Sequence, residues 1–464
     1  MRRSLVALAL GAALAVAGSA SAANIIVLSV DAPGTGLFDP TPAAPVGGNP
    51  GTTLGDQRAF VYDYAAQLWG AAIDSPVTIF VAARFTPQGC TPTSGTLGSA
   101  GTTFIFRNFA NAPVANTWYH SALADALAGV DLNPGFFDIS SNFNSRIDDA
   151  AQEATCLTGR NWYYGVDHQA GIDFDFLNVV SHEIAHGLGF ANFVNEGTGA
   201  LQSGFPDVYA RHTLDLATGL TWDQMTNAQR AASAVNDRHV VWNGVAATAE
   251  APSVLGPRPS VQVLNGAAAG SWEANPAAFG PAISGGGGTT GLVRVADDGV
   301  GVTSDACEPL VNAGADNVHG KIVLADRGAC NFTVKVANAQ AAGAKGVIVA
   351  NNVDDGTFSP MGGADPSIAI PSMGVSFDLG QELRASTPAV KLILDDSVGA
   401  GTEQGMVRLY APAVVSLGSS ISHWDVSANP NLLMEPFITN TLKAGETLDL
   451  TPALFEDLGW VLLP

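Results

Sequence analysis

The segment that most restricts this chain is the pentapeptide His-Glu-Ile-Ala-His at positions 182–186. On an α-helix, residues four positions apart lie on one face, one turn above the other. Two imidazoles with that spacing can bind one zinc ion at about 2.0–2.1 Å. Glu183 stands beside them and can hold a water at the metal without being a ligand. The pattern therefore predicts a zinc site, with His182 and His186 as ligands and Glu183 as the catalytic residue.

The residues around this pentapeptide predict the helix that the site requires. Apolar side chains recur at helical spacing from Leu177 to Leu188, and such a stripe is typical of a helix with one buried face. Asp173 or Asp175 can cap the amino end. Glycines follow the second histidine, and they let the helix stop.

A catalytic zinc normally takes three protein ligands and a water, so a third ligand must be found. The sequence continues to match the pattern H-E-x-x-H-x-x-G-x-x-H as far as the glycine, but Asn192 stands at the position of the last histidine. An amide is a poor zinc ligand. Glu196 lies too close in sequence to come from a second helix, and Asp207 is the better carboxylate alternative. His423 is the candidate that we favour.

The surroundings of His423 resemble the leishmanolysin-like branch of the metzincins. The residues that carry the resemblance are Ser-His-Trp-Asp at 422–425, Leu-Leu-Met-Glu-Pro at 432–436 and Leu-Phe-Glu-Asp-Leu-Gly-Trp at 454–460. In that branch an insertion separates the third histidine from the first two, and a methionine turn follows. The resemblance implies that His423 is the third zinc ligand and that Met434 forms an apolar floor beneath the metal. It also implies a metzincin-like catalytic domain with a mixed sheet and an active-site helix.

The interval between His186 and His423 is far longer than a loop. Its centre resembles the protease-associated (PA) domain over roughly residues 290–400. This resemblance implies a small β-rich fold that carries no chemistry; it either influences substrate access and partner binding or acts as a spacer. The matching segments are GKIVLADRGACNF at 320–332, KVANAQAAGA at 335–344, VIVANN at 347–352 and IPSM at 370–373.

The expected architecture is α+β: a metzincin-like catalytic domain interrupted by the PA-like domain. Composition predicts irregular structure from about 236 to 292, where Ala, Gly, Pro and Ser dominate. The expected domains are a signal peptide at 1–22, the first catalytic part at 23–240, the insertion at 241–410 and the second catalytic part at 411–464. Expected strands are 24–30, 77–81, 104–106, 321–325, 346–350, 368–371 and 390–394, and expected helices are 57–68, 118–127 and 333–342.

The amino-terminal residues predict export. A basic start at Arg2 and Arg3, an apolar stretch and the small residues Ala-Ser-Ala at 20–22 are typical of a signal peptide. No later segment has the 18 or more uninterrupted apolar residues of a membrane span. The net charge of −22 argues against nucleic-acid partners, because an acidic surface repels phosphate. We expect a secreted, extracellular protein.

The cysteines support that expectation. In an oxidising compartment cysteines are expected to pair, and the four in this chain allow three connectivities. Because they fall into two distant groups, Cys90–Cys156 and Cys307–Cys330 is the simplest pairing. Calcium is conceivable at the acidic Asp-Phe-Asp segment 173–175, although the chain has no EF-hand pattern.

The function predicted from these patterns is that of a secreted zinc-dependent endopeptidase acting on proteins or peptides. Glu183 would be the general base that activates a zinc-bound water. Two alternatives remain open: an inactive secreted binding protein that uses the PA-like domain, and a zinc hydrolase that acts on small amides. The sequence gives no side-chain preference and no oligomeric state.

Overall fold

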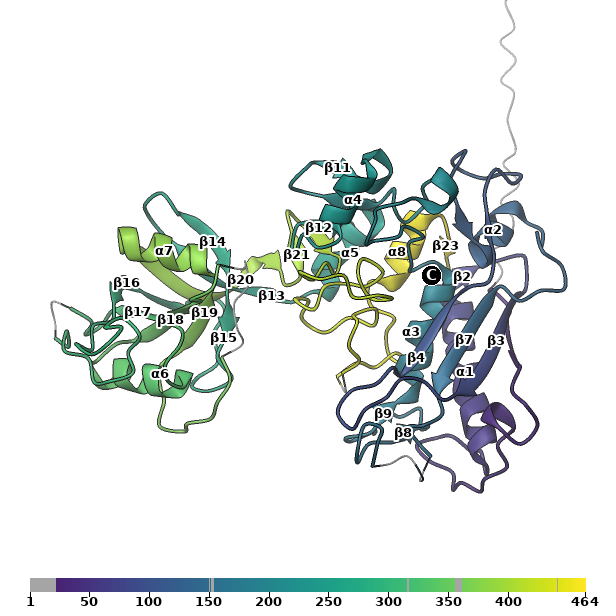
Figure 1. The fold of residues 1–464 in the computed structure, drawn as a ribbon, viewed down its shortest axis with the longest axis horizontal. Helices are drawn as coiled ribbons and strands as arrows, with labels where there is room; N and C mark the ends of the chain where they lie inside the picture. Colours follow the sequence, from purple (N-terminus) through teal and green to yellow (C-terminus); the bar gives the residue numbers. More distant parts are fainter. Residues whose placement is uncertain (1–21, 150, 152–153, 315–316, 355–360, 440) are drawn as a thin grey trace, which may run out of the picture.

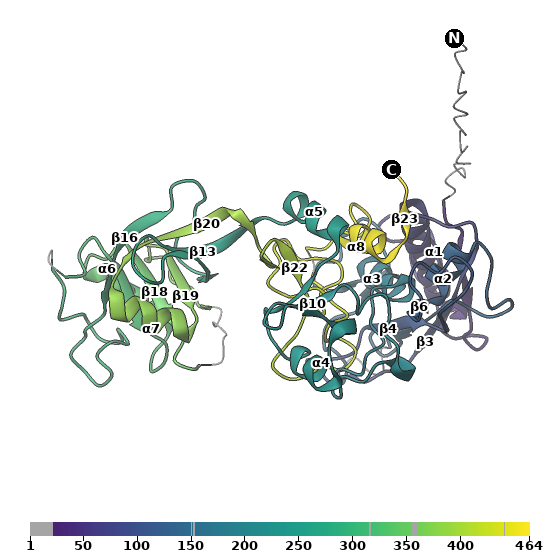
Figure 2. The same ribbon diagram turned by 90° about the horizontal axis from the view of Figure 1, so that it is seen from above.

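The computed structural model describes residues 22–149, 151, 154–314, 317–354, 361–439 and 441–464. The chain forms two bodies, and the strands β13 and β20 connect them (Figures 1 and 2). The expected signal peptide lies outside the described residues except for Ala22. No helix in those ranges is both long and apolar enough to cross a lipid bilayer. The expected α+β architecture is confirmed.

The larger body is built on a four-stranded mixed sheet in the order β1-β3-β7-β4. The first three strands run parallel, and the edge strand β4 runs antiparallel to β7. In β3 the buried residues include Ile79, Val81 and Phe85, and in β7 Ile139 and Phe143 are buried among Ser and Asn residues. The bounds are β1 (Ile25–Ser29), β3 (Ile79–Thr86), β7 (Ile139–Asn144) and β4 (Gly98–Thr102).

Two helices pack against each other and against this sheet, α1 (Leu54–Ala72) and α3 (Phe176–Leu188). Asp175 caps α3, because its carboxylate accepts the Leu177 N–H at 3.1 Å, and Gly189 ends the helix at φ +146°. Every residue of α3 is buried, so the helix lies inside the body. The histidine pentapeptide is thus held on a rigid element.

The rest of the larger body surrounds α3. A second sheet has the order β11-β10-β12-β22-β21. Its strands are β11 (Leu220–Thr221), β10 (Thr213–Asp215), β12 (Val240–Trp242), β22 (Met406–Arg408) and β21 (Thr402–Glu403). The short strand pairs are β2 (Ile73–Asp74) with β23 (Val461–Leu462), β5 (Ile105–Phe106) with β6 (Tyr119–His120), and β8 (Trp162–Tyr163) with β9 (Phe174–Asp175). The helices are α2 (Ser121–Ala128), α4 (Asn227–Ser233), α5 (Val245–Val254), α8 (Thr451–Leu458), η1 (Gly36–Phe38), η2 (Gln202–Gly204) and η3 (Trp222–Gln224).

The smaller body is an eight-stranded sheet with one helix on each face. Side chains alternate across a strand. Accordingly Ile322 and Leu324 pack with α7, whereas Val323 and Ala325 pack with α6. In sheet order the strands are β14 (Gly270–Glu273), β13 (Pro257–Val263), β20 (Ala389–Gly399), β16 (Thr289–Val295), β17 (Ile322–Asp326), β18 (Gly346–Ala350), β19 (Ser372–Val375) and β15 (Asn275–Pro276). The helices are α6 (Phe332–Ala341) and α7 (Phe377–Ser386).

Most expected elements are present with shifted ends, but two expectations were wrong. The segment 236–292 is not irregular: it contains β12, α5, β13, β14 and β15 and the start of β16. Its small and polar residues form regular elements because partner strands and the core of the larger body supply the packing. The strand expected at 368–371 begins instead at Ser372, because proline at 371 has no N–H for the ladder.

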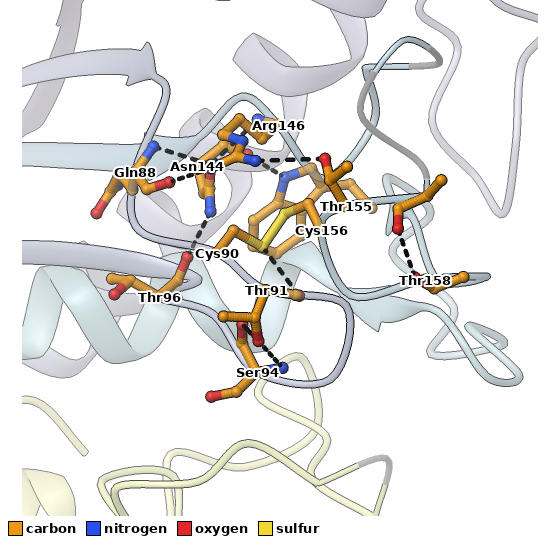
Figure 3. Close-up of a disulfide and its surroundings, with 12 residues drawn as sticks. Gln88, Cys90, Thr91, Ser94, Thr96, Asn144, Arg146, Thr155, Cys156 and Thr158 are labelled. Carbon is orange, nitrogen blue, oxygen red and sulfur yellow. Dashed lines mark hydrogen bonds between the residues drawn. A yellow bond between two sulfur atoms is a disulfide. The ribbon is translucent and has the colours of Figure 1, made fainter.

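Both expected disulfides are present. Cys90 and Cys156 are joined with their Cα atoms 5.0 Å apart, and Cys307 and Cys330 with theirs 5.7 Å apart. The first bond ties two loops together beside Asn144 and Arg146 (Figure 3). Asn144 donates to the Thr96 carbonyl at 2.9 Å, so hydrogen bonds and the disulfide act together on this loop. The second bond lies within the smaller body.

The contact between α3 and the sheet gives a first prediction. A Cβ atom at Gly187 would lie 2.4 Å from Ile139 Cγ2 on β7, so Gly187→Ala must push the helix away from the strand. Overpacking of this kind costs about 1–3 kcal/mol. We expect that loss in the free energy of unfolding, measured by urea denaturation in the presence of a chelator.

Gly101→Ala is the matched control. No described heavy atom lies within 4 Å of a Cβ at this β4 position, and the backbone is outside the left-handed region. We expect a change below about 0.5 kcal/mol. An equal loss in both variants would mean that close approach to Ile139 is not the reason for a glycine at 187.

Candidate metal centre

Three histidines from distant parts of the chain meet in the larger body. The Nε2 atom of His182 lies 3.1 Å from that of His186 and 3.2 Å from that of His423, and the last two are 3.3 Å apart. All three residues are less than a tenth exposed. The structure therefore brings together the three ligands named from the sequence.

The hydrogen bonds of the opposite ring nitrogens decide what this cluster can hold. Each Nδ1 lies against a backbone carbonyl: His182 against Leu433 at 2.7 Å, His186 against Phe190 at 2.7 Å and His423 against Ser419 at 2.8 Å. A carbonyl can only accept, so each Nδ1 must carry the proton of a neutral ring. The three Nε2 lone pairs then face one another, and they repel one another unless a cation lies between them.

The spacing fits a zinc ion. Tetrahedral zinc with bonds of about 2.0–2.1 Å places its nitrogen ligands about 3.3 Å apart, and the observed separations are 3.1–3.3 Å. Burial lowers the pKa of His182 to about 3 and that of His186 to about 4, and it holds the pKa of His423 well below the ordinary value. The rings are therefore neutral at physiological pH, as metal ligands must be.

Glu183 is part of α3, and its side chain lies against the edge strand β4. Its side chain is buried, and Oε2 has no hydrogen-bond partner among the described residues. Burial raises the pKa of Glu183 to about 8, and the Ala100 N–H on β4 partly opposes this rise by favouring the carboxylate. Oε2 is thus the carboxyl oxygen that is free to engage a water or a substrate.

The segment around Met434 supports the first ligand. Met434 is fully buried, and its carbonyl accepts the Trp424 N–H at 2.8 Å. The neighbouring Leu433 carbonyl is the acceptor for His182, and the Leu433 N–H donates in turn to the Asp449 carboxylate. Asp449 therefore fixes the peptide that orients His182, as outer residues of metal sites commonly do. Sequence patterns gave no indication of Asp449.

The alternative third ligands lie outside the cluster. Asn192 donates to Ser422 Oγ at 3.0 Å and to Glu196 at 3.1 Å, so it ties the chain after α3 to the residue before His423. Asp207 is buried and accepts the Phe193 and Ala210 N–H groups. Both residues therefore hold loops, and neither joins the three histidines.

The acidic segment proposed for calcium also has structural partners. Asp173 accepts the Asn161 N–H at 2.8 Å. Asp175 caps α3 and contacts His168 at 2.7 Å, and His168 accepts the Gly445 N–H through Nε2 at 3.2 Å. His168 therefore connects the start of α3 to the carboxyl-terminal segment, a role that no spacing pattern indicated. Calcium gains no support from these contacts.

Residues 289–383 match the PA domain family. The matched range corresponds to the β-rich centre of the smaller body, where the sequence had predicted such a domain. His182, Glu183, His186 and His423 all lie outside this range, so the match characterises the insertion and not the histidine cluster.

Curated and solved proteins are similar to limited parts of the chain. A receptor homology region, transmembrane domain- and RING domain-containing protein of Arabidopsis thaliana is 35% identical over 136 residues, which are 28% of this chain and 30% of that protein. Leucine aminopeptidase 2 of Trichophyton rubrum is 40% identical over 76 residues, 16% of this chain and 15% of the relative. A zinc aminopeptidase structure from Bacillus subtilis has 24% identity and a TM-score of 0.23, with 30% of each chain covered. The chain thus spans less than a third of each of these proteins, and the last two are both named as aminopeptidases.

The cluster gives a second prediction. His423→Ala removes one of three converging lone pairs, so we expect zinc content, measured by elemental analysis of the dialysed protein, to fall from one per chain to well below one half. His239→Ala is the control, because His239 is exposed and lies outside the cluster. Stoichiometric zinc in His423→Ala would require a different third ligand, with Asp207 the first to test.

Proposed function

We propose that this protein is a secreted zinc-dependent endopeptidase. The observation that carries the proposal is the meeting of three neutral, buried imidazoles whose Nε2 lone pairs face one another. The second support is the buried Glu183 carboxyl with one free oxygen at the next position of the helix. Three nitrogen ligands, an open fourth position and a carboxylate are the parts that zinc-assisted hydrolysis needs.

Glu183 would move the proton in this reaction. His182, His186 and His423 would hold a zinc ion, which would supply Lewis acidity by lowering the pKa of a bound water to about 7 and polarising the substrate carbonyl. A nearby cation also favours the ionised form of Glu183. The free oxygen of the carboxylate accepts the proton of the attacking water and then donates it to the leaving amine.

The strand β4 is the element on which we would place the substrate. It pairs with β7 on one side and is the edge of its sheet within the described residues. Along an antiparallel strand, alternate residues direct their backbone groups to opposite sides. Thr103 donates to the Asp138 carbonyl and Leu97 accepts from the Asn144 N–H, so the alternate residue Ala100 directs its N–H away from β7, and that side of β4 can pair with an extended peptide. Residues of β4 continue on both sides of Ala100, which favours a substrate that extends in both directions.

We propose in addition that the larger body is a leishmanolysin-like metzincin domain. Its supports are the His-Trp pair at 423–424, the buried Met434 beside the peptide that binds His182, and a terminal helix, α8, that ends at Gly459. Export is proposed from the amino-terminal sequence, and the two disulfides agree with an oxidising compartment.

Glu183→Gln provides the test of the mechanism. The amide keeps the size of the side chain but cannot accept the proton, so we expect kcat to fall by about 10²–10⁴-fold with zinc content unchanged. Glu456→Gln, an exposed position on α8, should retain full activity. Turnover in Glu183→Gln equal to that of wild type would remove Glu183 from the reaction.

A blocked peptide distinguishes the type of peptidase. We expect the zinc-loaded protein to cleave internal bonds of a peptide with an acetylated amino end and an amidated carboxyl end, because pairing along β4 requires no free terminus. Mass spectrometry of the products, with and without a chelator, makes the measurement. Trimming of the unblocked peptide alone would indicate an aminopeptidase. Cleavage of neither peptide would favour the inactive binding protein. Cleavage of small amides alone would favour the zinc hydrolase that acts on small amides.

A further inference from the structure

The segment of the third histidine is hydrogen-bonded to β22, a strand that the chain forms in the larger body after it returns from the inserted body on β20. β22 is antiparallel to β12, and Arg408 lies opposite Val241. The Arg408 carbonyl accepts the Asp425 N–H at 3.0 Å, and the His423 carbonyl accepts the Tyr410 N–H at 2.9 Å. The backbone of β22 and the residues after it therefore fixes the segment that contains His423.

The side chain of Arg408 connects this segment to the inserted body. Arg408 is only 2% exposed. Its guanidinium contacts Glu273 at 2.7 Å, Glu403 at 2.6 Å and Ser427 Oγ at 3.4 Å. Ser427 donates both its N–H and its hydroxyl to the carboxylate of Asp425, two residues after His423. Arg408 thus reaches the segment of the third histidine through its backbone and its side chain.

Glu273 is the only one of these partners that belongs to the inserted body. It ends β14, where it pairs with Ser260 of β13. A second cation, Arg238 of the larger body, lies 3.4 Å from the same carboxylate oxygen. Burial acts to raise the pKa of Glu273, but the guanidinium groups of Arg408 and Arg238 outweigh it and leave the pKa below its usual value. Removal of one member of a buried ion pair is strongly unfavourable, because the remaining charge loses its compensation.

We infer that Glu273 is a positioning residue for the third metal ligand and acts through Arg408. The ion pair seats the inserted body on the larger one and holds Arg408 where it fixes the segment 423–427. The affinity for the metal then depends on the seating of the inserted body, which gives the insertion a role beyond that of a spacer. This inference rests on the proposed metal centre at the three histidines.

Linkage makes the coupling reciprocal. If seating strengthens metal binding by some factor, metal binding must strengthen seating by the same factor. A partner that displaces the inserted body from the larger one would therefore lower the affinity for the metal, and bound metal would oppose this displacement. Both directions can be measured without any assay of peptide cleavage.

The test is Glu273→Gln, which keeps the size of the side chain and removes its charge. We expect the dissociation constant for zinc, measured by competition with a chromophoric chelator, to rise by about tenfold, at the lower end of the range for outer residues of metal sites. We also expect a changed absorption spectrum of the cobalt-substituted protein, since the geometry around His423 is altered.

Asp326→Asn is the matched control. Asp326 on β17 forms an ion pair with Arg384 of α7, entirely within the inserted body. Loss of this carboxylate should leave the dissociation constant for zinc within about twofold of wild type and the cobalt spectrum unchanged. Equal affinities of Glu273→Gln and wild type, or an equal loss in Asp326→Asn, would overturn the inference and leave the metal centre intact.

The wild-type protein provides a second measurement that does not depend on the folding of a variant. Addition of zinc should slow hydrogen exchange at β14 and leave β17 unchanged. Unchanged exchange at β14 would count against the coupling. A wild-type protein that binds no zinc, in contrast, would overturn the proposed function together with this inference.

Discussion

The arrangement of the three histidines depends on three hydrogen bonds between imidazole Nδ1 groups and backbone carbonyls. Each bond fixes one ring in the tautomer that directs an unprotonated Nε2 to the same point. Without these carbonyls the rings could share protons among themselves and the cluster would be an ordinary hydrogen-bonded group. Because the carbonyls belong to Leu433, Phe190 and Ser419, the site requires the end of α3 and two segments beyond the insertion to be in place at once. Assembly of the site is therefore a consequence of the whole fold.

Local periodicity explains how much of this could be predicted from the sequence. The helix that carries His182 and His186 follows from residue spacing, and its cap at Asp175 was among the two expected. His423 could be named because of a family resemblance, since no spacing relates it to α3. The roles of Asp449 and of the Glu273–Arg408 pair could not be predicted, because each acts across a tertiary contact between residues distant in sequence. Such contacts leave no periodic pattern in the chain.

The error at 236–292 has the same origin. Composition describes the intrinsic tendency of a segment, and a segment rich in Ala, Gly, Pro and Ser has little tendency towards regular structure. In the folded chain, Ala247 and Ala251 of α5 are buried in the core of the larger body, and Val261 and Val263 of β13 in that of the smaller body. Packing against residues far along the chain decides the structure of this segment.

The arrangement of the insertion explains why so long an interruption leaves His423 beside His182 and His186. The chain leaves on β13 and returns on β20, and the two strands pair antiparallel from Pro257 with Gly399 to Val263 with Val390. The two ends of the insertion therefore lie side by side (Figure 1). The larger body needs to hold only these two neighbouring ends, although many residues separate them in the sequence. After β20 the chain forms β21 and β22 of the larger body, and backbone hydrogen bonds from Arg408 and Tyr410 hold the segment of His423 beside the end of β22.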